Sequence, residues 1–296
     1  MQVLFLGTGS MVPTPERNTS GMVVSHRDEH VLIDCGEGTQ KQMRMAKFSP
    51  AKVTRILITH WHGDHVFGLP GLLSTISQIE LSHPIQLYGP PGTKKFLKVL
   101  FSSYINLNKL PLKVHECKEG FVFETKEFKV EAKKMAHTSL CYAYAFIEKD
   151  KRSIDMEYVK KFGLTSNPIL KELQAGKDIT WNKKKIKAKD ATIIKKGKKL
   201  AVIFDTMMCK EAVAIAKNAD VLICESTLDA SLKELAKSYK HLTCDDAASV
   251  AKKANVKQLV LTHFSQRYND VRPLEDSAKK IFPKTIVARD FAVIDV

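Results

Sequence analysis

The segment His60-Trp61-His62-Gly63-Asp64-His65 constrains this chain more than any other part of its sequence. It places four residues of metal-ligating type within six positions, directly after the apolar run 55–59. A β-strand that ends in such a cluster delivers imidazole and carboxylate groups to one edge of a sheet, where ligands from other strand ends can join them. These groups suit zinc and similar divalent ions. The segment therefore predicts a metal site and argues against a chance surface pattern.

Three further residues of ligand type follow strand-like runs: His137 after 130–136, Asp205 after 200–204 and His263 after 259–262. Each alone is equally well explained as a capped strand end or a hydrogen-bonded core group. Together they complete two sites, with His60, His62 and His137 in one, Asp64, His65 and His263 in the other, and Asp205 as a bridge. Two ions about 3.5–4 Å apart can bind a phosphoryl oxygen and stabilise both the attacking and the leaving oxygen.

The remaining sequence alternates strand-like and helix-like runs over 296 residues. The early strand-like runs look antiparallel, whereas the later ones alternate with helices. Two sheets packed together with helices outside satisfy both patterns. Helix-like runs are 39–45, 68–77, 93–103, 209–216, 228–238, 244–254 and 274–281. The pattern predicts an α/β chain that buries a substantial core.

Residues 151–199 interrupt this rhythm and carry 15 Lys and Arg against 5 Asp and Glu, a surplus of 10 in a chain of net charge +15. The segment is too long for a simple connection and contains Gly163, Pro168 and Gly176, so we expect an inserted arm. A lysine-rich solvated surface is one explanation. The concentration of charge in one segment favours contact with a nucleic acid instead.

Composition restricts the remaining possibilities. No apolar run approaches the roughly 20 residues that span a bilayer, so we expect no membrane contact. The first residues form a strand-like run without a basic leader, which predicts an untargeted cytoplasmic protein. The six cysteines form no Cys-x-x-Cys pair and lie mostly in apolar contexts, which favours packed, reduced thiols over a cysteine-based zinc module.

The chain resembles the ribonuclease Z family of the metallo-β-lactamase superfamily, from its first strand to its C-terminus. The resemblance rests on Phe5-Leu6-Gly7-Thr8-Gly9, Asp34-Cys35-Gly36-Glu37-Gly38-Thr39-Gln40, the histidine cluster, His137, Asp205-Thr206, Glu225-Ser226-Thr227, His241-Leu242-Thr243 and His263-Phe264-Ser265-Gln266-Arg267-Tyr268. The histidine cluster marks the superfamily, whereas the second and last motifs are more particular to the family. The resemblance implies one domain, 1–296, with a four-layer αββα sandwich and an inserted basic arm at about 153–196.

The resemblance also implies an activity. The chain would be a zinc-dependent endoribonuclease that removes 3′ trailers from tRNA precursors by attack of a metal-bound hydroxide. The cut would leave a 3′-hydroxyl on the tRNA and a 5′-phosphate on the trailer. Two Zn²⁺ ions per chain, or other divalent ions, a precursor tRNA partner and a homodimer are implied with it.

Individual roles follow from the same resemblance. Asp64 would ligate metal and take the proton of the attacking water, while Asp34 would orient a ligating histidine from outside the ligand set. Glu225 with His241 would protonate the leaving oxygen; a hydrogen bond at a helix start is the alternative explanation of that pair.

Substrate contacts are implied in three places. Arg17 and Asn18 belong to the family's first substrate loop, Ser265 and Arg267 would contact phosphate, and Lys183, Lys184 and Lys185 of the arm would grip tRNA without reading its bases. Two positions depart from the family pattern. Pro15 stands where lysine is expected in a loop associated with the 3′ end, and Leu242 replaces the middle residue of a His-Ser-Thr motif.

Two rival functions share the fold. A phosphodiesterase or other hydrolase of small molecules would be expected to lack a large basic arm, so the arm disfavours it. A non-catalytic RNA-binding subunit would be expected to have lost ligands, yet all seven are present. An endoribonuclease is therefore the favoured interpretation.

Overall fold

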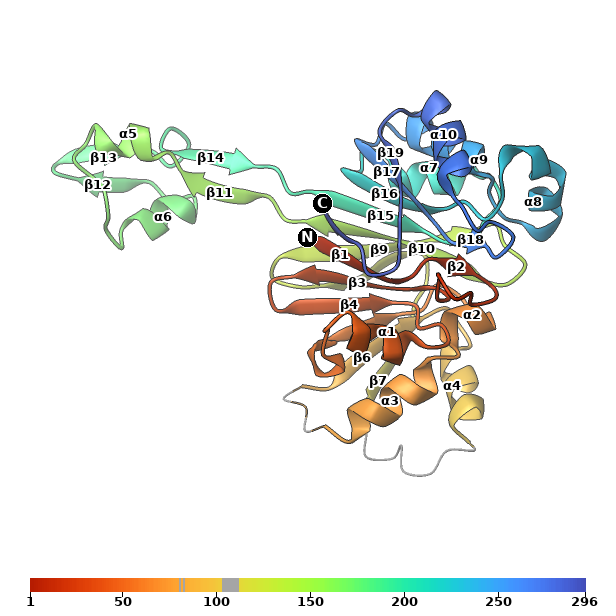
Figure 1. Ribbon diagram of the computed structural model, residues 1–296. Helices are drawn as coiled ribbons and strands as arrows, with labels where there is room; N and C mark the ends of the chain where they lie inside the picture. Colours follow the sequence, from red (N-terminus) through yellow and green to blue (C-terminus); the bar gives the residue numbers. More distant parts are fainter. Residues whose placement is uncertain (80, 82, 103–111) are drawn as a thin grey trace. The chain divides into compact units, whose positions relative to one another are not determined.

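The computed structural model of the chain describes residues 1–79, 81, 83–102 and 112–296 (Figure 1). These residues divide into two compact units. Met1–Phe146 together with Lys199–Val296 form the first, which we call the body, and Ile147–Lys198 form the second, which we call the arm.

The first sheet of the body has seven strands in the order β20-β1-β3-β4-β5-β6-β7. Their bounds are β20 (Val293–Asp295), β1 (Gln2–Gly7), β3 (Gly21–His26), β4 (Glu29–Ile33), β5 (Arg55–Leu57), β6 (Ile85–Gly89) and β7 (Leu112–Glu116). Each pair of neighbouring strands from β20 to β4 is antiparallel. Each pair of neighbouring strands from β4 to β7 is parallel. Because β4 and β5 are parallel, the residues that follow them, Asp34 and His60, emerge at the same edge.

The second sheet has the order β19-β17-β16-β15-β10-β9-β8. Its strands are β19 (Thr285–Val287), β17 (Gln258–Thr262), β16 (Val221–Glu225), β15 (Lys199–Ile203), β10 (Cys141–Glu148), β9 (Phe128–Met135) and β8 (Gly120–Glu124). Strands β15, β16, β17 and β19 are parallel, and Glu225 lies opposite Thr262 in the register. Asp205, Glu225 and His263 therefore come to the same edge of this sheet. A two-stranded pair, β2 (Gly9–Ser10) with β18 (Phe264–Ser265), joins the loops at that edge.

The apolar side chains explain the layering. Residues such as Phe5, Val31 and Ile33 of the first sheet share one buried cluster with Tyr144 and Phe204 of the second, so the inner faces pack on each other. The outer face of the first sheet packs on α1 (Thr39–Met45) and α3 (Leu69–Ser77) in another cluster. Helices α7 (Lys210–Ala216), α9 (Cys244–Lys253) and α10 (Arg272–Ile281) cover the outer face of the second (Figure 1). The expected four-layer sandwich is confirmed.

The body helices are α1 (Thr39–Met45), α2 (Gly63–Val66), α3 (Leu69–Ser77), α4 (Thr93–Phe101), α7 (Lys210–Ala216), α8 (Lys233–Tyr239), α9 (Cys244–Lys253) and α10 (Arg272–Ile281), with 3-10 turns at Pro50–Lys52 and Ala230–Leu232. Each helix-like run of the sequence overlaps one of them, although residue 103, the end of the run 93–103, lies outside the described residues. The short α2 and the strand β7 escaped the sequence pattern. Helix α9 begins with a capping box in which Thr243 and Asp246 bond each other's backbone N–H.

The arm, which the sequence predicted as an inserted segment, is a small folded unit. Strand β11 (Lys151–Ile154) pairs with β14 (Thr192–Lys195), and β12 (Ile179–Trp181) forms a hairpin with β13 (Lys184–Ile186). Helices α5 (Met156–Lys160) and α6 (Leu170–Gln174) complete it. Seven buried residues form its own core: Val159, Leu164, Leu173, Ile179, Ile186, Ala188 and Ala191. The arm thus folds around apolar contacts even though most of its basic residues are exposed.

All six cysteines are unpaired, and five of them are buried. The burial of these five matches the packed thiols expected from their apolar contexts. The helices of the described residues are each too short or too polar to cross a membrane.

Candidate metal centre

Four loop segments bring the predicted ligands together at the shared edge of the two sheets. The segment after β5 carries His60, His62, Asp64 and His65; the residues after β9, β15 and β17 are His137, Asp205 and His263. Their donor atoms form two groups, each with all atoms within 4.8 Å of one another: His60, His62, His137 and Asp205 in the first, and Asp64, His65 and His263 in the second. The structure therefore brings all seven residues together in the two sets that the sequence predicted.

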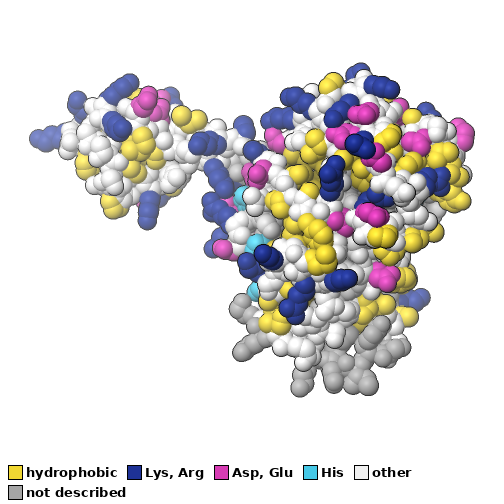
Figure 2. Space-filling model, in the orientation of Figure 1, with side chains coloured by type: hydrophobic (Ala, Val, Ile, Leu, Met, Phe, Trp, Pro, Cys, Tyr) yellow, Lys and Arg dark blue, Asp and Glu magenta, His cyan; other side chains and the backbone are white. Residues whose placement is uncertain are grey.

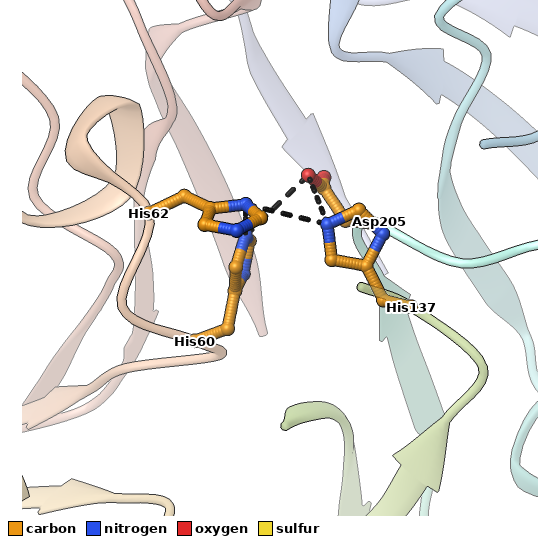
Figure 3. A group of neighbouring side chains, drawn as sticks. All are labelled: His60, His62, His137 and Asp205. Atoms are coloured by element: carbon orange, nitrogen blue, oxygen red, sulfur yellow. Dashed lines mark hydrogen bonds and ion pairs between the residues drawn. The ribbon is translucent and has the colours of Figure 1, made fainter. Parts of the chain in front are cut away.

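The first group is built around the ring nitrogens that point inward (Figure 3). Nε2 of His60 lies 3.0 Å from Nδ1 of His62, which lies 3.3 Å from Nε2 of His137. The Oδ2 atom of Asp205 lies 3.4 Å and 3.5 Å from the Nε2 atoms of His60 and His137. Three nitrogens and one oxygen at such distances surround a space that suits a single cation.

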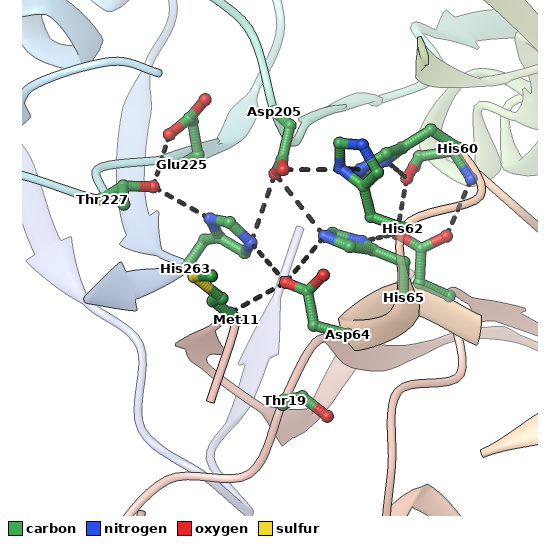
Figure 4. A network of polar contacts seen from close by, with 12 residues as sticks. Met11, Thr19, His60, His62, Asp64, His65, Asp205, Glu225, Thr227 and His263 are labelled. Carbon is green, nitrogen blue, oxygen red and sulfur yellow. Dashed lines mark hydrogen bonds and ion pairs between the residues drawn. The ribbon is translucent and has the colours of Figure 1, made fainter. Parts of the chain in front are cut away.

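The second group combines two ring nitrogens with two carboxylate oxygens (Figure 4). The Oδ2 atom of Asp64 lies 3.4 Å from Nε2 of His65 and 3.6 Å from Nε2 of His263. Oδ1 of Asp205 lies 3.6 Å and 3.2 Å from the same two nitrogens. Because Oδ2 of Asp205 faces the first group and Oδ1 faces the second, its carboxylate has the geometry of a bridge.

Unpartnered atoms provide a test of whether a cation fits. Nε2 of His65, Nε2 of His263 and Oδ1 of Asp205 are buried and have no hydrogen-bond partner among the described residues. A buried polar atom without a partner is destabilising by about 1–3 kcal/mol, yet here three such atoms converge on one point. A divalent cation would satisfy all three, so the residues present fit a metal.

The outer ring nitrogens are held by other groups, which leaves Nε2 free to face inward in four of the five histidines. Nδ1 of His65 donates to Asp34 over 2.7 Å, and Nδ1 of His137 donates to the carbonyl of Lys240 over 3.0 Å. Nδ1 of His60 and His263 contact Thr59 and Thr227 at 3.0 and 2.9 Å. Such partners set the tautomer and orientation of ligating imidazoles.

Asp34 is fully buried and makes more than one such contact. Besides His65, its carboxylate accepts the hydroxyl of Thr59 at 2.7 Å and the Thr59 N–H at 2.8 Å. The neighbouring Gly36 lies so close to the ligand segment that a Cβ there would come within 2.3 Å of the carbonyl oxygen of Asp64. The Asp34–Gln40 motif thus packs against the ligand segment and helps to hold it in position.

Electrostatics favours the ligand forms of the acidic groups and of one histidine. Burial lowers the pKa of His137 to about 4, which keeps the imidazole neutral. Burial opposes ionisation of Asp64, but His65 and His263 hold its pKa well below the usual range. The surrounding carboxylates raise the pKa of His65 against the effect of burial, so a proton and a cation compete for Nε2.

Beside the centre, Glu225 and His241 form a hydrogen-bonded pair. Nδ1 of His241 lies 3.0 Å from Oε2 of the fully buried Glu225. Burial alone lowers the pKa of His241, but the Glu225 carboxylate outweighs it and raises the pKa to about 9. Thr227 joins the pair to the ligands, because its hydroxyl donates to Glu225 at 2.6 Å and lies 2.9 Å from His263. Sequence reasoning assigned no role to Thr227; its position in the Glu225–Thr227 motif was the available signal.

A cavity of about 810 Å³ opens over the centre. Its lining includes His62, Asp64, His137, Asp205 and His241, together with Ser265 and Arg267. The Arg267 side chain is exposed and donates to the Ser265 hydroxyl over 3.2 Å. These two predicted phosphate contacts therefore lie in the same cavity as the donors.

The other predicted substrate residues have different surroundings. Arg17 is largely buried, and its guanidinium donates to the carbonyls of Ser265 and Tyr268. Asn18 donates through its side chain to the carbonyl of Glu37 at 2.7 Å. In these positions both residues hold the first loop against the body.

Lys183, Lys184 and Lys185 lie on the β12–β13 hairpin of the arm and are exposed. Lys185 pairs with Asp178 at 3.4 Å. Figure 2 shows Lys and Arg side chains spread around the visible face of the arm, and acidic ones in a smaller area. The arm therefore offers a distributed positive surface.

Comparison with known proteins identifies the chain's family. A protein-family model described as Anti-Pycsar protein Apyc1 matches residues 1–164, so this half of the chain belongs with those sequences. Ribonuclease Z of Picosynechococcus sp. is 40% identical, with 98% of this chain and 95% of that protein covered. The chain belongs to the ribonuclease Z family.

Two solved structures agree with that assignment. Human tRNase Z, short form, is 31% identical, covers 100% of this chain and 99% of its own, and superposes with a TM-score of 0.73. The metallo-β-lactamase fold protein YhfI from Bacillus subtilis, 19% identical with coverages of 99% and 98% and a TM-score of 0.73, shows the fold alone. The expected fold and family are confirmed, and membership makes the chain a metal-dependent endoribonuclease.

Proposed function

We propose that this ribonuclease Z family member removes 3′ trailers from tRNA precursors with two zinc ions per chain, leaving a 3′-hydroxyl on the tRNA and a 5′-phosphate on the trailer. The observation that carries the proposal is the pair of donor groups joined by Asp205, with three buried donor atoms that have no hydrogen-bond partner among the described residues. Donor sets of imidazole and carboxylate suit zinc, and other divalent ions of similar preference would also fit.

The ligands proposed are His60, His62, His137 and Asp205 for one ion and Asp64, His65, His263 and Asp205 for the other. Bound there, the ions would polarise a phosphoryl oxygen and make water a better nucleophile. Asp64 would ligate through Oδ2, which faces Nε2 of His65 and His263, and its carboxylate would take the proton of the attacking water. Asp34 holds His65 in the orientation that ligation needs, through the 2.7 Å hydrogen bond.

His241 is proposed to protonate the leaving 3′-oxygen. Glu225 stabilises the imidazolium through Nδ1 and raises its pKa to about 9, so a proton is available at neutral pH. Because Nδ1 is held by Glu225, Nε2 is the nitrogen that donates. A carboxylate–imidazole pair of this kind suits general acid catalysis.

The substrate contacts proposed are Ser265 and Arg267 for the phosphates next to the cut, and Arg17 and Asn18 for the loop beside them. The hydrogen bonds of Arg17 to the carbonyls of Ser265 and Tyr268 support an action through the Ser265 segment. For the arm, exposed lysines such as Lys183 and Lys184 support phosphate contact without base reading. Shape would then select the tRNA, as is usual for helical RNA.

We also propose a homodimer in the cytoplasm. The six unpaired cysteines support a reducing compartment, and the dimer is supported by the resemblance to the family.

The test compares two substrates on one preparation of known metal content. A tRNA precursor with a 3′ trailer should be cut once, with about two equivalents of zinc bound per chain. A tRNA product that accepts ligation at its 3′-hydroxyl, and a trailer degraded by a 5′-phosphate-dependent exonuclease, would show the expected ends. Hydrolysis of bis(p-nitrophenyl) phosphate without cleavage of the precursor would contradict the proposal and favour a small-molecule phosphodiesterase.

A further inference from the structure

Three strongly exposed apolar side chains line the cavity over the metal centre. Met11, Phe67 and Tyr239 are 75%, 64% and 60% exposed. Among the described residues only two other large hydrophobic side chains are as exposed as these, Val99 and Phe121, and neither lines the cavity. Apolar groups gathered at one concave site commonly mark a binding surface.

Phe67 is placed by the ligand segment itself. It follows α2, and its ring packs directly on Gly63, between the ligands His62 and Asp64. A Cβ at position 63 would lie 2.3 Å from Cε2 of the ring and 2.7 Å from Cζ. The glycine therefore makes room for the ring, and the ring remains 64% exposed at the cavity.

Tyr239 lines the same cavity from the segment that follows β16 of the second sheet. It ends α8, and the next residue, Lys240, has a positive φ of 55°. The Lys240 carbonyl accepts Nδ1 of His137 at 3.0 Å, and the following residue is His241. The backbone after Tyr239 is thus held by a hydrogen bond to the proposed ligand His137, and it continues directly to the proposed acid, His241.

A polynucleotide has a chemical group that matches these two rings. The donors of the centre can engage only the scissile phosphate, while the flanking bases present flat apolar faces. Aromatic side chains stack on such faces whatever the base, and this stacking is a main source of affinity for single-stranded nucleic acids.

We propose that Phe67 and Tyr239 are base-contacting residues on the two sides of the scissile phosphate, an assignment that rests on the proposed function. The leaving 3′-oxygen belongs to the nucleotide on the 5′ side and is protonated by His241. Tyr239, two residues before His241, therefore stacks on the base 5′ to the cut. Phe67, beside Asp64, stacks on the first base of the trailer.

The experiment combines side-chain changes with removal of single bases. Phe67→Leu and Tyr239→Leu keep apolar volume but remove the flat face. Phe121→Leu is the matched control, because Phe121 is 65% exposed and lies outside the cavity. The substrates are a precursor tRNA, the same RNA with an abasic nucleotide 3′ to the cut, and one with it 5′ to the cut. The measured quantity is kcat/KM, with zinc content determined for each protein.

Each variant should lose about 5- to 150-fold in kcat/KM on the intact precursor, the range found for base–aromatic stacking. The Phe67→Leu loss should shrink to within about twofold on the RNA that lacks the 3′-side base, and the Tyr239→Leu loss on the RNA that lacks the 5′-side base, since no stack is left to remove. Phe121→Leu should match the wild type on all three RNAs.

Other outcomes overturn the inference. Equal losses of kcat/KM on intact and abasic RNA, or a loss of zinc in Phe67→Leu, would show that the rings support the ligand segment and do not contact bases. No loss on any RNA would show that the rings contact no base. If the wild-type protein fails to cut the intact precursor, the proposed function itself is wrong, which is a separate result.

Discussion

The arm has the charge to bind phosphate groups, and the metal centre would gain it from bound cations, but the two regions are built in opposite ways. At the centre, His60, His65 and Asp205 are almost wholly buried, and each has its position set by named partners. On the arm, Lys183 and Lys184 are exposed and form no ion pair with any described residue. One region fixes a few donors, whereas the other presents many unfixed charges.

Backbone conformation shows the same contrast. Asp34, His263, Met11 and Lys240 surround the centre with positive φ angles of 55°, 60°, 64° and 55°. Non-glycine residues in this region are destabilised by on the order of 1–3 kcal/mol each, and such strain gathers at functional sites. In the arm, the positive φ angles of Asn182 and Lys183 form the two-residue turn of the β12–β13 hairpin, where such angles are usual.

The comparison suggests how each region should respond to change. A preorganised site loses most of its function when one member is altered, because its partners cannot move to compensate. A distributed surface should lose binding in small and similar steps, because each bound phosphate contributes independently.

The largest effect is expected from Asp205→Asn. The amide keeps the shape of the side chain but removes the negative charge that both donor groups share, so zinc content should fall below two equivalents and the cleavage rate by at least about 10³-fold. Elemental analysis with single-turnover cleavage of a precursor would measure both. Asp220→Asn, which alters an aspartate just before β16 that pairs with the exposed Lys257, is the control. Full zinc content in Asp205→Asn would break the idea of a shared bridge.

A smaller effect is expected from His241→Ala, which should keep zinc and slow single-turnover cleavage by about 10²–10⁴-fold. The pKa of about 9 gives the pH dependence. The proton is present below that pKa, so the wild-type rate should hold to about pH 8 and fall as the pH rises through about 9.

The variant Glu225→Gln tests whether Glu225 sets the pKa of His241. Without the carboxylate, burial should lower the pKa of His241, and the decline in rate should begin at lower pH than in the wild type. His241→Ala should lack the decline altogether. A pH profile identical in the wild type and His241→Ala would mean that another group protonates the leaving oxygen.

The smallest effect is expected from changing Lys183, Lys184 and Lys185 together to glutamine. Precursor affinity should weaken, and the log–log slope of affinity against salt should flatten by about 0.7–0.9 for each phosphate that these lysines neutralise in the wild type. Zinc content should be unaffected, because every proposed ligand lies in the body. Binding titrations over a series of salt concentrations would measure the slope.

A control with the same reduction in charge uses exposed lysines of α9 and α10 in the body: Lys252, Lys253 and Lys280. If the salt dependence of affinity changes as much in this variant as in the arm variant, the lysines of the arm are a solvated surface without a specific role in binding. A change confined to the arm variant would separate a specific exosite from the general effect of net charge.

The sequence predicted the structure best at sites where a local pattern is enough to place a residue. A run of apolar residues followed by a histidine or aspartate predicts a donor at a strand end, and this rule located His137, Asp205 and His263 although 126 positions separate the first from the last. It also predicted the grouping that the structure brings together. The strands of the arm and the short strand β7 were missed, because brief segments with mixed composition carry little periodic signal.

The order of donors along the chain, the two-sheet sandwich and the separate basic segment can be predicted from the sequence, because periodicity, spacing or charge indicates each of them. Which atom of each donor faces inward depends on the three-dimensional packing of the chain. That packing alone brought the Lys240 carbonyl to His137, turned the guanidinium of Arg17 toward the Ser265 carbonyl, and set Phe67 and Tyr239 in one cavity. These contacts join residues far apart in the chain, and their geometry depends on how the packed layers meet, which no local pattern records.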